Sequence, residues 1–182
     1  MNRYKNIVGF AVVIILISAA IFIYTGSRKL APFREFRSSE GFFTVLMPGT
    51  PYVLHEDMEM PFGKIDTTTY MAGSRVIGCA VAFADYPAKL IQTTDTQKLF
   101  DMAKNEAVKN AGGKLISENR IDYHKLPAMD VRIEVPGSAF TAVRYILNGP
   151  RFYTLMFFAP SEKGHEQDIS KFFDSFQIDG VK

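Results

Sequence analysis

The sequence contains no tryptophan and a single cysteine, Cys79, among 182 residues. One cysteine excludes an intramolecular disulfide, so cysteine counting cannot identify the compartment. Cys79 lies in the apolar run VIGCAVAF, with no basic residue inside the run to lower its thiol pKa. The thiol is therefore predicted to be a small buried apolar group and not a nucleophile.

The common motifs of catalysis are also missing. The sequence has no G-x-x-x-x-G-K-[ST], G-x-S-x-G, H-E-x-x-H or C-x-x-C pattern. Its three histidines, His55, His124 and His165, lie far apart in the chain. We therefore expect a noncatalytic protein without a cofactor. The alternative is a hydrolase or metal-dependent enzyme whose site is assembled from residues distant in sequence.

One short pattern has the residue types of a metal site. His55, Asp57 and Glu59 alternate along an expected strand, so their side chains would share one face. An imidazole and two carboxylates suit a divalent ion. Side chains two residues apart on a strand, however, are separated by about 6–7 Å. We interpret the pattern as the solvated face of a strand and expect no metal.

The longest uncharged run lies near the beginning of the chain. Residues 7–24, IVGFAVVIILISAAIFIY, would form a helix about 27 Å long, close to the hydrocarbon thickness of a bilayer of about 30 Å. A cleaved signal peptide is the alternative, but its apolar run is shorter, about 7–15 residues. We predict a membrane anchor at 1–24, with the lipid bilayer contacted by residues 7–24, a juxtamembrane linker at 25–35 and a globular domain at 36–182.

Basic residues flank this run, whereas the domain is slightly acidic. From residue 38 onward the chain has 15 basic and 18 acidic residues, so no nucleic-acid partner is expected. The basic residues after the span favour a cytoplasmic domain, but a short N-terminus before a single span usually stays inside. We expect a single-pass membrane protein with an extracytoplasmic domain.

The rest of the chain has the patterns of strands, with two helical segments. The apolar stripe of residues 96–111 and the spacing of Ile169, Phe172, Phe173 and Phe176 predict helices at 96–111 and 162–176, each with one core face. Short connections predict antiparallel pairing. The fold class is therefore α+β, with a large antiparallel sheet and two main helices packed on it. Strands are expected at 42–47 (covered on both sides), 52–60, 64–72, 75–84, 114–123, 130–135, 140–147 and 152–158.

Asp85, Tyr86 and Pro87 follow the most apolar of these strands. Binding groups are frequent on loops, so these three residues form a candidate binding loop. The alternative is a strand terminator, because Asp and Pro are common in turns.

Three segments resemble a known family. The segment SEGFFTVLMPGTP is similar to the opening strand, F-x-V-x-x-P-x-x-P, of PsbP-like α/β/α sandwich domains in membrane-anchored or exported bacterial proteins. KFFDSFQI resembles their closing helix, and YHKLPAMD resembles a turn written G-x-P-G-x-[DE], with His124 and Ala128 in place of its glycines. The resemblance implies a noncatalytic protein-binding or assembly module. We expect its partner to be another envelope protein. It implies no catalytic residues.

Overall fold

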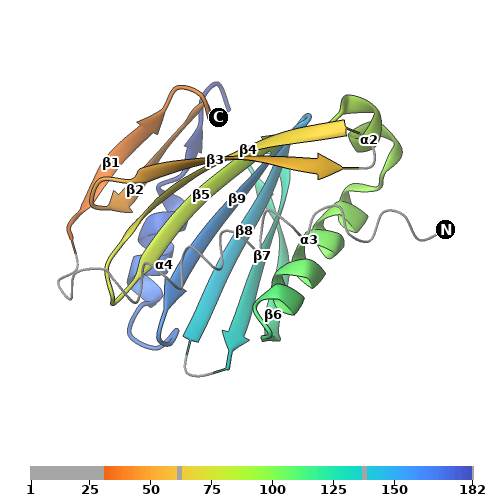
Figure 1. Ribbon diagram of the computed structural model, residues 1–182. Coiled ribbons are helices and arrows are strands. Elements are labelled where there is room, and N and C mark those ends of the chain that lie inside the picture. Colours follow the sequence, from red (N-terminus) through yellow and green to blue (C-terminus); the bar gives the residue numbers. More distant parts are fainter. Residues whose placement is uncertain (1–30, 61–62, 137–138, 182) are drawn as a thin grey trace.

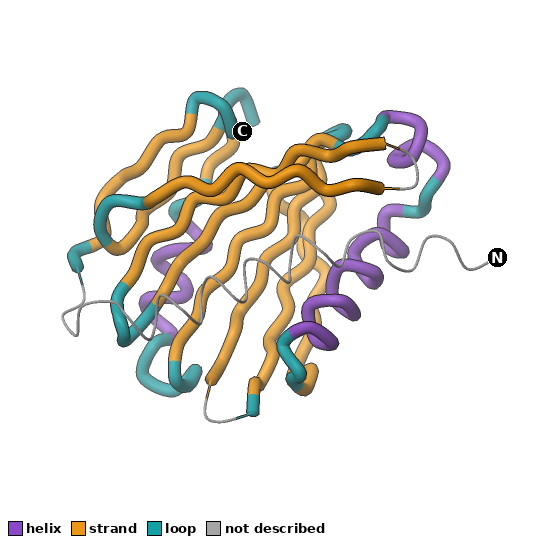
Figure 2. The backbone as a smooth tube through the Cα atoms, viewed as in Figure 1, coloured by secondary structure: helices purple, strands orange, loops and turns teal. Residues whose placement is uncertain are grey.

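Two antiparallel sheets and three helices make up the described part of the chain (Figures 1 and 2). The computed structural model describes residues 31–60, 63–136 and 139–181. The larger sheet has seven strands in the order β3-β4-β5-β9-β8-β7-β6. They are β3 (Tyr52–Met60), β4 (Gly63–Gly73), β5 (Gly78–Asp85), β6 (Lys114–Tyr123), β7 (Leu126–Val135), β8 (Ala139–Asn148) and β9 (Arg151–Ala159).

The smaller sheet has three strands in the order β1-β2-β10. They are β1 (Phe33–Ser38), β2 (Phe43–Pro48) and β10 (Gln177–Ile178). The helices are α2 (Ala88–Thr93), α3 (Thr96–Asn110) and α4 (Glu166–Asp174). The prediction of a large antiparallel sheet with two main helices is therefore confirmed.

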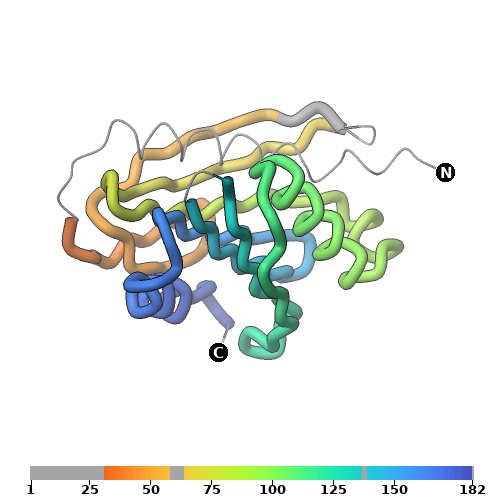
Figure 3. The backbone as a smooth tube through the Cα atoms, turned by 90° about the horizontal axis from the view of Figure 1, so that it is seen from below, coloured from red at the N-terminus to blue at the C-terminus, as the bar shows by residue number. Residues whose placement is uncertain are grey.

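The large sheet separates two apolar clusters, because its central strands carry apolar side chains on both faces. On β9, Met156 and Phe158 belong to the cluster that includes α3. Leu155 and Phe157 belong to the cluster that includes α4 and the small sheet. The layers are thus α3, the large sheet, and α4 beside the small sheet (Figure 3).

The aromatic stripe predicted for the closing helix faces the core. Ile169, Phe172, Phe173 and Phe176 are all at most 3% exposed. The helix itself is shorter than expected: α4 begins at Glu166, because Gly164 has a φ of +90°, and Phe176 lies beyond its end. The Arg144 guanidinium lies 4.8 Å from the centre of the Phe173 ring, so this ring contacts both the core and a cation.

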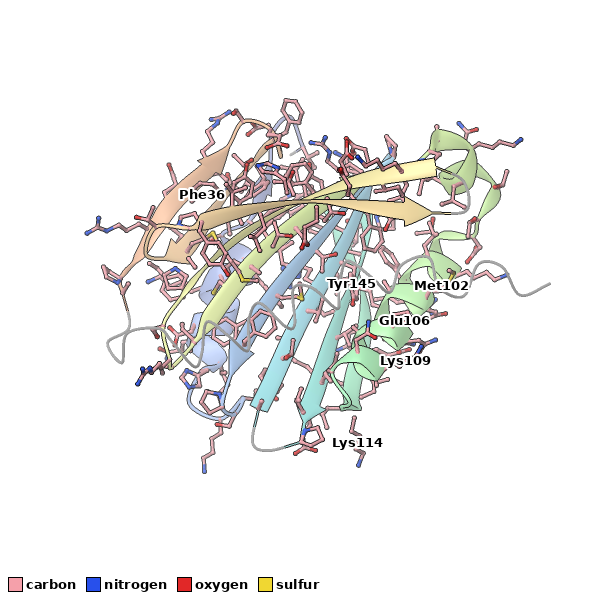
Figure 4. All side chains as sticks on the ribbon, viewed as in Figure 1. Phe36, Met102, Glu106, Lys109, Lys114 and Tyr145 are labelled. Carbon is pink, nitrogen blue, oxygen red and sulfur yellow. The ribbon has the colours of Figure 1, made fainter. Side chains whose placement is uncertain are left out.

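Helix α3 has the ends that the sequence predicts. The Asp95 carboxylate accepts a hydrogen bond from the Lys98 N–H at 3.2 Å, and Gly112 after the helix has a φ of +56°. The helix packs on β7, and the Tyr145 hydroxyl of β8 donates to the Ala103 carbonyl at 3.3 Å (Figure 4). The same cluster includes the alanines of β5.

The turn between β6 and β7 explains part of the family resemblance. His124 and Lys125 both have positive φ values, +50° and +68°, as in a two-residue hairpin of type I′. Glycine adopts this conformation without a steric penalty. The family pattern has a glycine where this chain has His124.

Several boundaries differ from the prediction. β1 begins at Phe33, inside the expected linker, and its Phe36 packs on Phe43 and Tyr70. β5 begins at Gly78 instead of residue 75, because Ser74 turns the chain with an N–H to Ile77 carbonyl bond of 2.7 Å. The strand expected at 42–47 begins at Phe43, since Phe42 lies in the turn and is 55% exposed; within β2 one face is buried, and Thr44 and Leu46 on the other face are half-buried. β7 begins at Leu126, four residues before its expected start.

The predicted membrane anchor, residues 7–24, lies outside the described residues. Within residues 31–60, 63–136 and 139–181, no helix combines the length and the apolar character that a bilayer span requires. The anchor therefore stays a prediction, as does the division of the chain at residues 24 and 35.

Replacing Phe173 by alanine is expected to lower the free energy of unfolding by about 3–5 kcal/mol, because it removes a fully packed ring and leaves a cavity. Gln167→Ala on the exposed side of α4 is the control and should change it by less than about 0.5 kcal/mol. Urea unfolding measures both. Equal losses would contradict the assignment of the buried face.

Candidate functional site

The segment from Asp85 to Pro87 connects the end of β5 to the start of α2. Asp85 is the last residue of β5 and lies opposite Arg151 of β9, and Pro87 is the N-cap residue of α2. The predicted binding loop is thus a short connection at one end of the large sheet. Its three residues have different surroundings.

Asp85 is engaged in an ion pair. Arg151 donates to both Asp85 carboxylate oxygens, through Nε at 2.7 Å and Nη2 at 2.5 Å, and through Nη1 to the Glu40 carbonyl at 2.9 Å. The guanidinium also lies over the rings of Phe42 and Phe83, at 5.2 and 4.7 Å from their centres. Hydrogen bonding to Asp85 raises the pKa of Arg151, against the opposite effect of burial. The Arg151 guanidinium, held by the Asp85 carboxylate, therefore joins the large sheet to the β1–β2 turn.

Tyr86 is buried at 7% exposure. Its N–H donates to the Pro150 carbonyl at 2.9 Å, and its ring packs against Phe152 with centres 6.1 Å apart. Burial raises the pKa of its hydroxyl to about 12, so the group stays protonated at neutral pH. Among the described residues, no group hydrogen bonds with this hydroxyl.

A pocket of about 480 Å³ lies beside Tyr86, between α2 and α3. We call it the Tyr86 pocket. Its apolar lining comes from both helices and from β9, and exposed polar side chains complete it. Met102 lies on the half of α3 nearer to α2 (Figure 4). The lining consists of Tyr86, Leu90, Ile91, Thr93, Thr94, Asp95, Lys98, Leu99, Met102 and Phe152.

The predicted His55, Asp57 and Glu59 face is divided among different contacts. His55 Nδ1 lies 3.1 Å from the Thr68 hydroxyl, which donates to Glu40. Asp57 forms an ion pair with Lys64 across the β3–β4 hairpin. The side chain of Glu59 lies outside the described residues. In the part of the chain that the structure describes, no three His, Cys, Asp or Glu residues are grouped to hold a metal ion.

The other two histidines lie elsewhere in the fold. His124 occupies the β6–β7 turn, with its ring 4.8 Å from that of Tyr123. His165 precedes α4, and its Nδ1 lies 3.5 Å from an Asp168 oxygen. Cys79 is fully buried in β5, as predicted, and burial raises the pKa of its thiol.

The two outer strands of the large sheet form a second surface feature. β3 begins with two exposed apolar residues, Tyr52 at 36% and Val53 at 44%, and pairs in regular register with β4. β6 instead has a register irregularity between Leu115 and Ser117, where Ile116 is 51% exposed. We call the outer side of Tyr52–Asp57 the β3 edge.

No protein-family model and no curated protein sequence matches this chain. Among solved structures, the solution structure of cyanobacterial PsbP from Synechocystis sp. PCC 6803 superposes with a TM-score of 0.55 at 12% identity, covering 84% of this chain and 96% of that one. A Pseudomonas aeruginosa protein of unknown function, also 12% identical, has a TM-score of 0.39 over 76% of this chain and 91% of that one. The first match confirms the predicted PsbP-like fold.

Sequence reasoning singled out Tyr86 but did not find the pocket beside it. Its other apolar residues come from α2, which was not predicted, from Leu99 and Met102 of α3, and from Phe152 of β9. Helix α2 could have been predicted from Pro87 followed by Leu90 and Ile91, because a proline before apolar residues is typical of the start of a helix with an apolar side. The binding role of the loop stays a prediction.

Replacing Arg151 by lysine is expected to lower the free energy of unfolding by about 1–2 kcal/mol. Lysine cannot form the two-oxygen contact with Asp85 and the carbonyl bond together, and charged hydrogen bonds contribute about 1.5–3 kcal/mol when well shielded. Because Asp85 is half exposed, the lower part of that range applies. Chemical denaturation measures the loss, and amide exchange should accelerate at Gly41 and Phe42.

The control is Arg120→Lys, at an exposed position of β6. It should leave both measurements unchanged. Unaltered exchange at Gly41 in Arg151→Lys would contradict the conclusion that Arg151 holds the β1–β2 turn.

Proposed function

We propose that this chain is a noncatalytic assembly module of the bacterial cell envelope, tethered to the membrane by residues 7–24, which binds a partner protein through the β3 edge. The PsbP-like fold and the uncharged run of 18 residues support this proposal. The observation that carries it is the position of β3 at the end of the strand order of the large sheet, as far as the described residues show. The domain is placed outside the cytoplasm in this proposal.

The β3 edge has the geometry that an extended peptide requires. Its inner side pairs with β4 without interruption from Tyr52–Met71 to Met60–Gly63. In the described part of the chain no strand pairs with its outer side, where β3 ends the strand order. Backbone N–H and C=O groups there can hydrogen bond to an added strand, and Tyr52 and Val53 offer apolar contacts beside them.

The charges of this hairpin define the kind of partner. Asp57 lies directly opposite Asp66, and hydrogen bonding with Asp57 raises the pKa of the Asp66 carboxyl. Glu56 adds a third carboxylate, and Lys64 pairs with Asp57. Like charges opposite each other are unfavourable, so a second copy of the same edge would be repelled. An extended segment rich in Lys or Arg would be attracted.

The opposite edge is less suited to strand addition. The irregularity at Ile116 interrupts β6, and such bulges discourage edge-to-edge pairing. Exposed apolar residues occur at both edges of the large sheet, so their exposure does not decide which edge binds a partner. The regular pairing register of β3 favours strand addition there over β6.

The enzyme alternative lacks a supporting constellation among the described residues. His55, His124 and His165 contact a threonine hydroxyl, a tyrosine ring and a nearby aspartate, respectively. Arg144 and Arg151 hold Asp130 and Asp85 in two-oxygen contacts that join elements of the fold. We therefore retain the binding module as the proposed function.

The tether is tested by membrane fractionation. The full chain should stay in the membrane fraction after alkaline carbonate washing, because an uncharged run of 18 residues is long enough to span the hydrocarbon core. External protease added to spheroplasts should digest the domain. Release with a new N-terminus near residues 22–26 would show a cleaved signal instead, and protection from protease would reverse the orientation.

The partner surface is tested by photo-crosslinking in intact membranes. A photoreactive residue at position 53 should give one discrete protein adduct, whereas the same residue at position 116 on the interrupted edge should not. Reversing the charge at Glu56 and Asp57 with lysines should weaken the position-53 adduct at least severalfold, because it removes the attraction for a basic segment. Equal adducts at both positions, or an adduct unaffected by charge reversal, would contradict the proposal.

A further inference from the structure

We infer that the Tyr86 pocket is a binding site for an uncharged, mainly apolar small molecule that carries one carbonyl-type oxygen. This inference concerns a different surface from the β3 edge and does not depend on the partner proposed there. It rests on three properties of the pocket: its lining, its volume and the hydroxyl of the buried residue Tyr86.

The lining is apolar on three sides. Leu90 and Ile91 of α2 are half-buried and pack against the same cluster as Leu99 and Phe152, and Met102 of α3 joins them. Helix α2 has no fully buried residue, so its apolar side chains face the pocket without being enclosed by the core. A ligand would complete the burial of these side chains and gain the corresponding apolar area.

The volume fits a small molecule better than a single side chain of a protein partner. About 480 Å³ lies within the range of about 300–1,000 Å³ that is typical of small-molecule sites. Such sites are mostly apolar and contain a few polar groups that orient the ligand. Here the buried polar group is Tyr86.

The Tyr86 hydroxyl determines the polar feature of the ligand. The residue is 93% buried, and its pKa of about 12 keeps the hydroxyl a hydrogen-bond donor at neutral pH. The hydroxyl oxygen itself is not enclosed, since the buried side-chain atoms without a partner among the described residues are Thr67 Oγ1 and Thr69 Oγ1. A hydrocarbon that excludes water from this donor would leave it unpaired, so a ligand oxygen that accepts its hydrogen bond would be favoured over a hydrocarbon of equal shape. Tyr86 is the one buried polar residue of the lining.

The charged residues of the lining exclude a strongly charged ligand. Asp95 and Lys98 are both exposed and have opposite charges, and one Asp95 oxygen is already used to cap α3. A ligand charge inside the pocket would lose hydration without meeting a buried counter-charge. Uncharged molecules avoid this cost.

The test compares two probes of nearly equal shape, 2-acetylnaphthalene, which has a carbonyl oxygen, and 2-ethylnaphthalene, which lacks it. Each is titrated into the full chain in lipid nanodiscs, with methionine methyl groups labelled with carbon-13. The Met102 methyl signal, assigned by Met102→Leu, reports binding inside the pocket. The quantity compared is the ratio of the two affinities in the wild type and in Tyr86→Phe, so that partition of the probes into lipid cancels.

Both probes should shift the Met102 signal saturably. Tyr86→Phe keeps the ring and its contact with Phe152, and it should lower the ketone-to-hydrocarbon affinity ratio by about three- to tenfold, the effect of one neutral hydrogen bond. Ile91→Arg, which places a charge in the apolar lining, should weaken both probes. Absence of saturable shifts for both probes, or an unchanged ratio in Tyr86→Phe, would overturn the inference. Neither result bears on the crosslink at position 53.

Discussion

The central strands of the large sheet are apolar on both faces, and the rest of the architecture follows from covering them. β9 sends Leu155 and Phe157 to one side and Met156 and Phe158 to the other, all at most 5% exposed. Burying each such side chain contributes about 1.5–3 kcal/mol relative to exposure. One layer alone would leave half of this area in water. The chain therefore places α3 on one face, and α4 with the small sheet on the other.

Polar contacts then determine how these layers sit on each other. The Tyr153 hydroxyl donates to the Gly41 carbonyl at 2.8 Å, and Arg144 binds Asp130 while lying over the Phe173 ring. Such shielded ion pairs add little net stability compared with apolar replacements, because both charges lose hydration. Removing one partner is far more costly than the pair is favourable. We therefore assign these contacts mainly to the geometry of the layers, and apolar burial to their stability.

The helices and strands that could be predicted from the sequence are those whose own residues contain a recognisable pattern of apolar residues or a helix cap. The alternation of apolar and charged residues along 130–135 of β7 and the spacing of Ile169, Phe172 and Phe173 are local patterns with a period of two or of about 3.6 residues, and the Asp95 cap of α3 is a local signal of a helix start. β10 has two residues and α2 has six, which is too short for any period to be recognised. A strand at 75–84 was predicted, with Asp85 in the loop after it, but the pairing of this carboxylate with Arg151, 66 residues away, depends on the order of strands in the sheet. The Tyr86 pocket depends in addition on where α2 lies relative to α3 and to Phe152 of β9.

The acidic end of the β3 edge, Glu56 and Asp57, lies at the same end of the large sheet as the Tyr86 pocket, and the strand register explains why polar groups are tolerated there. β4 pairs with β5 only from Thr67 onward, so its first four residues, with their partners on β3, extend beyond the end of β5 (Figure 1). Without a neighbouring strand on that side, Asp57 and Asp66 stay exposed to water and do not enter the core. β5 ends at the same level and leads through Tyr86 into α2. Ile65 and Tyr86 still pack into the cluster that includes α3, whereas the exposed carboxylates Asp57 and Asp66 are available for recognition at little cost in stability.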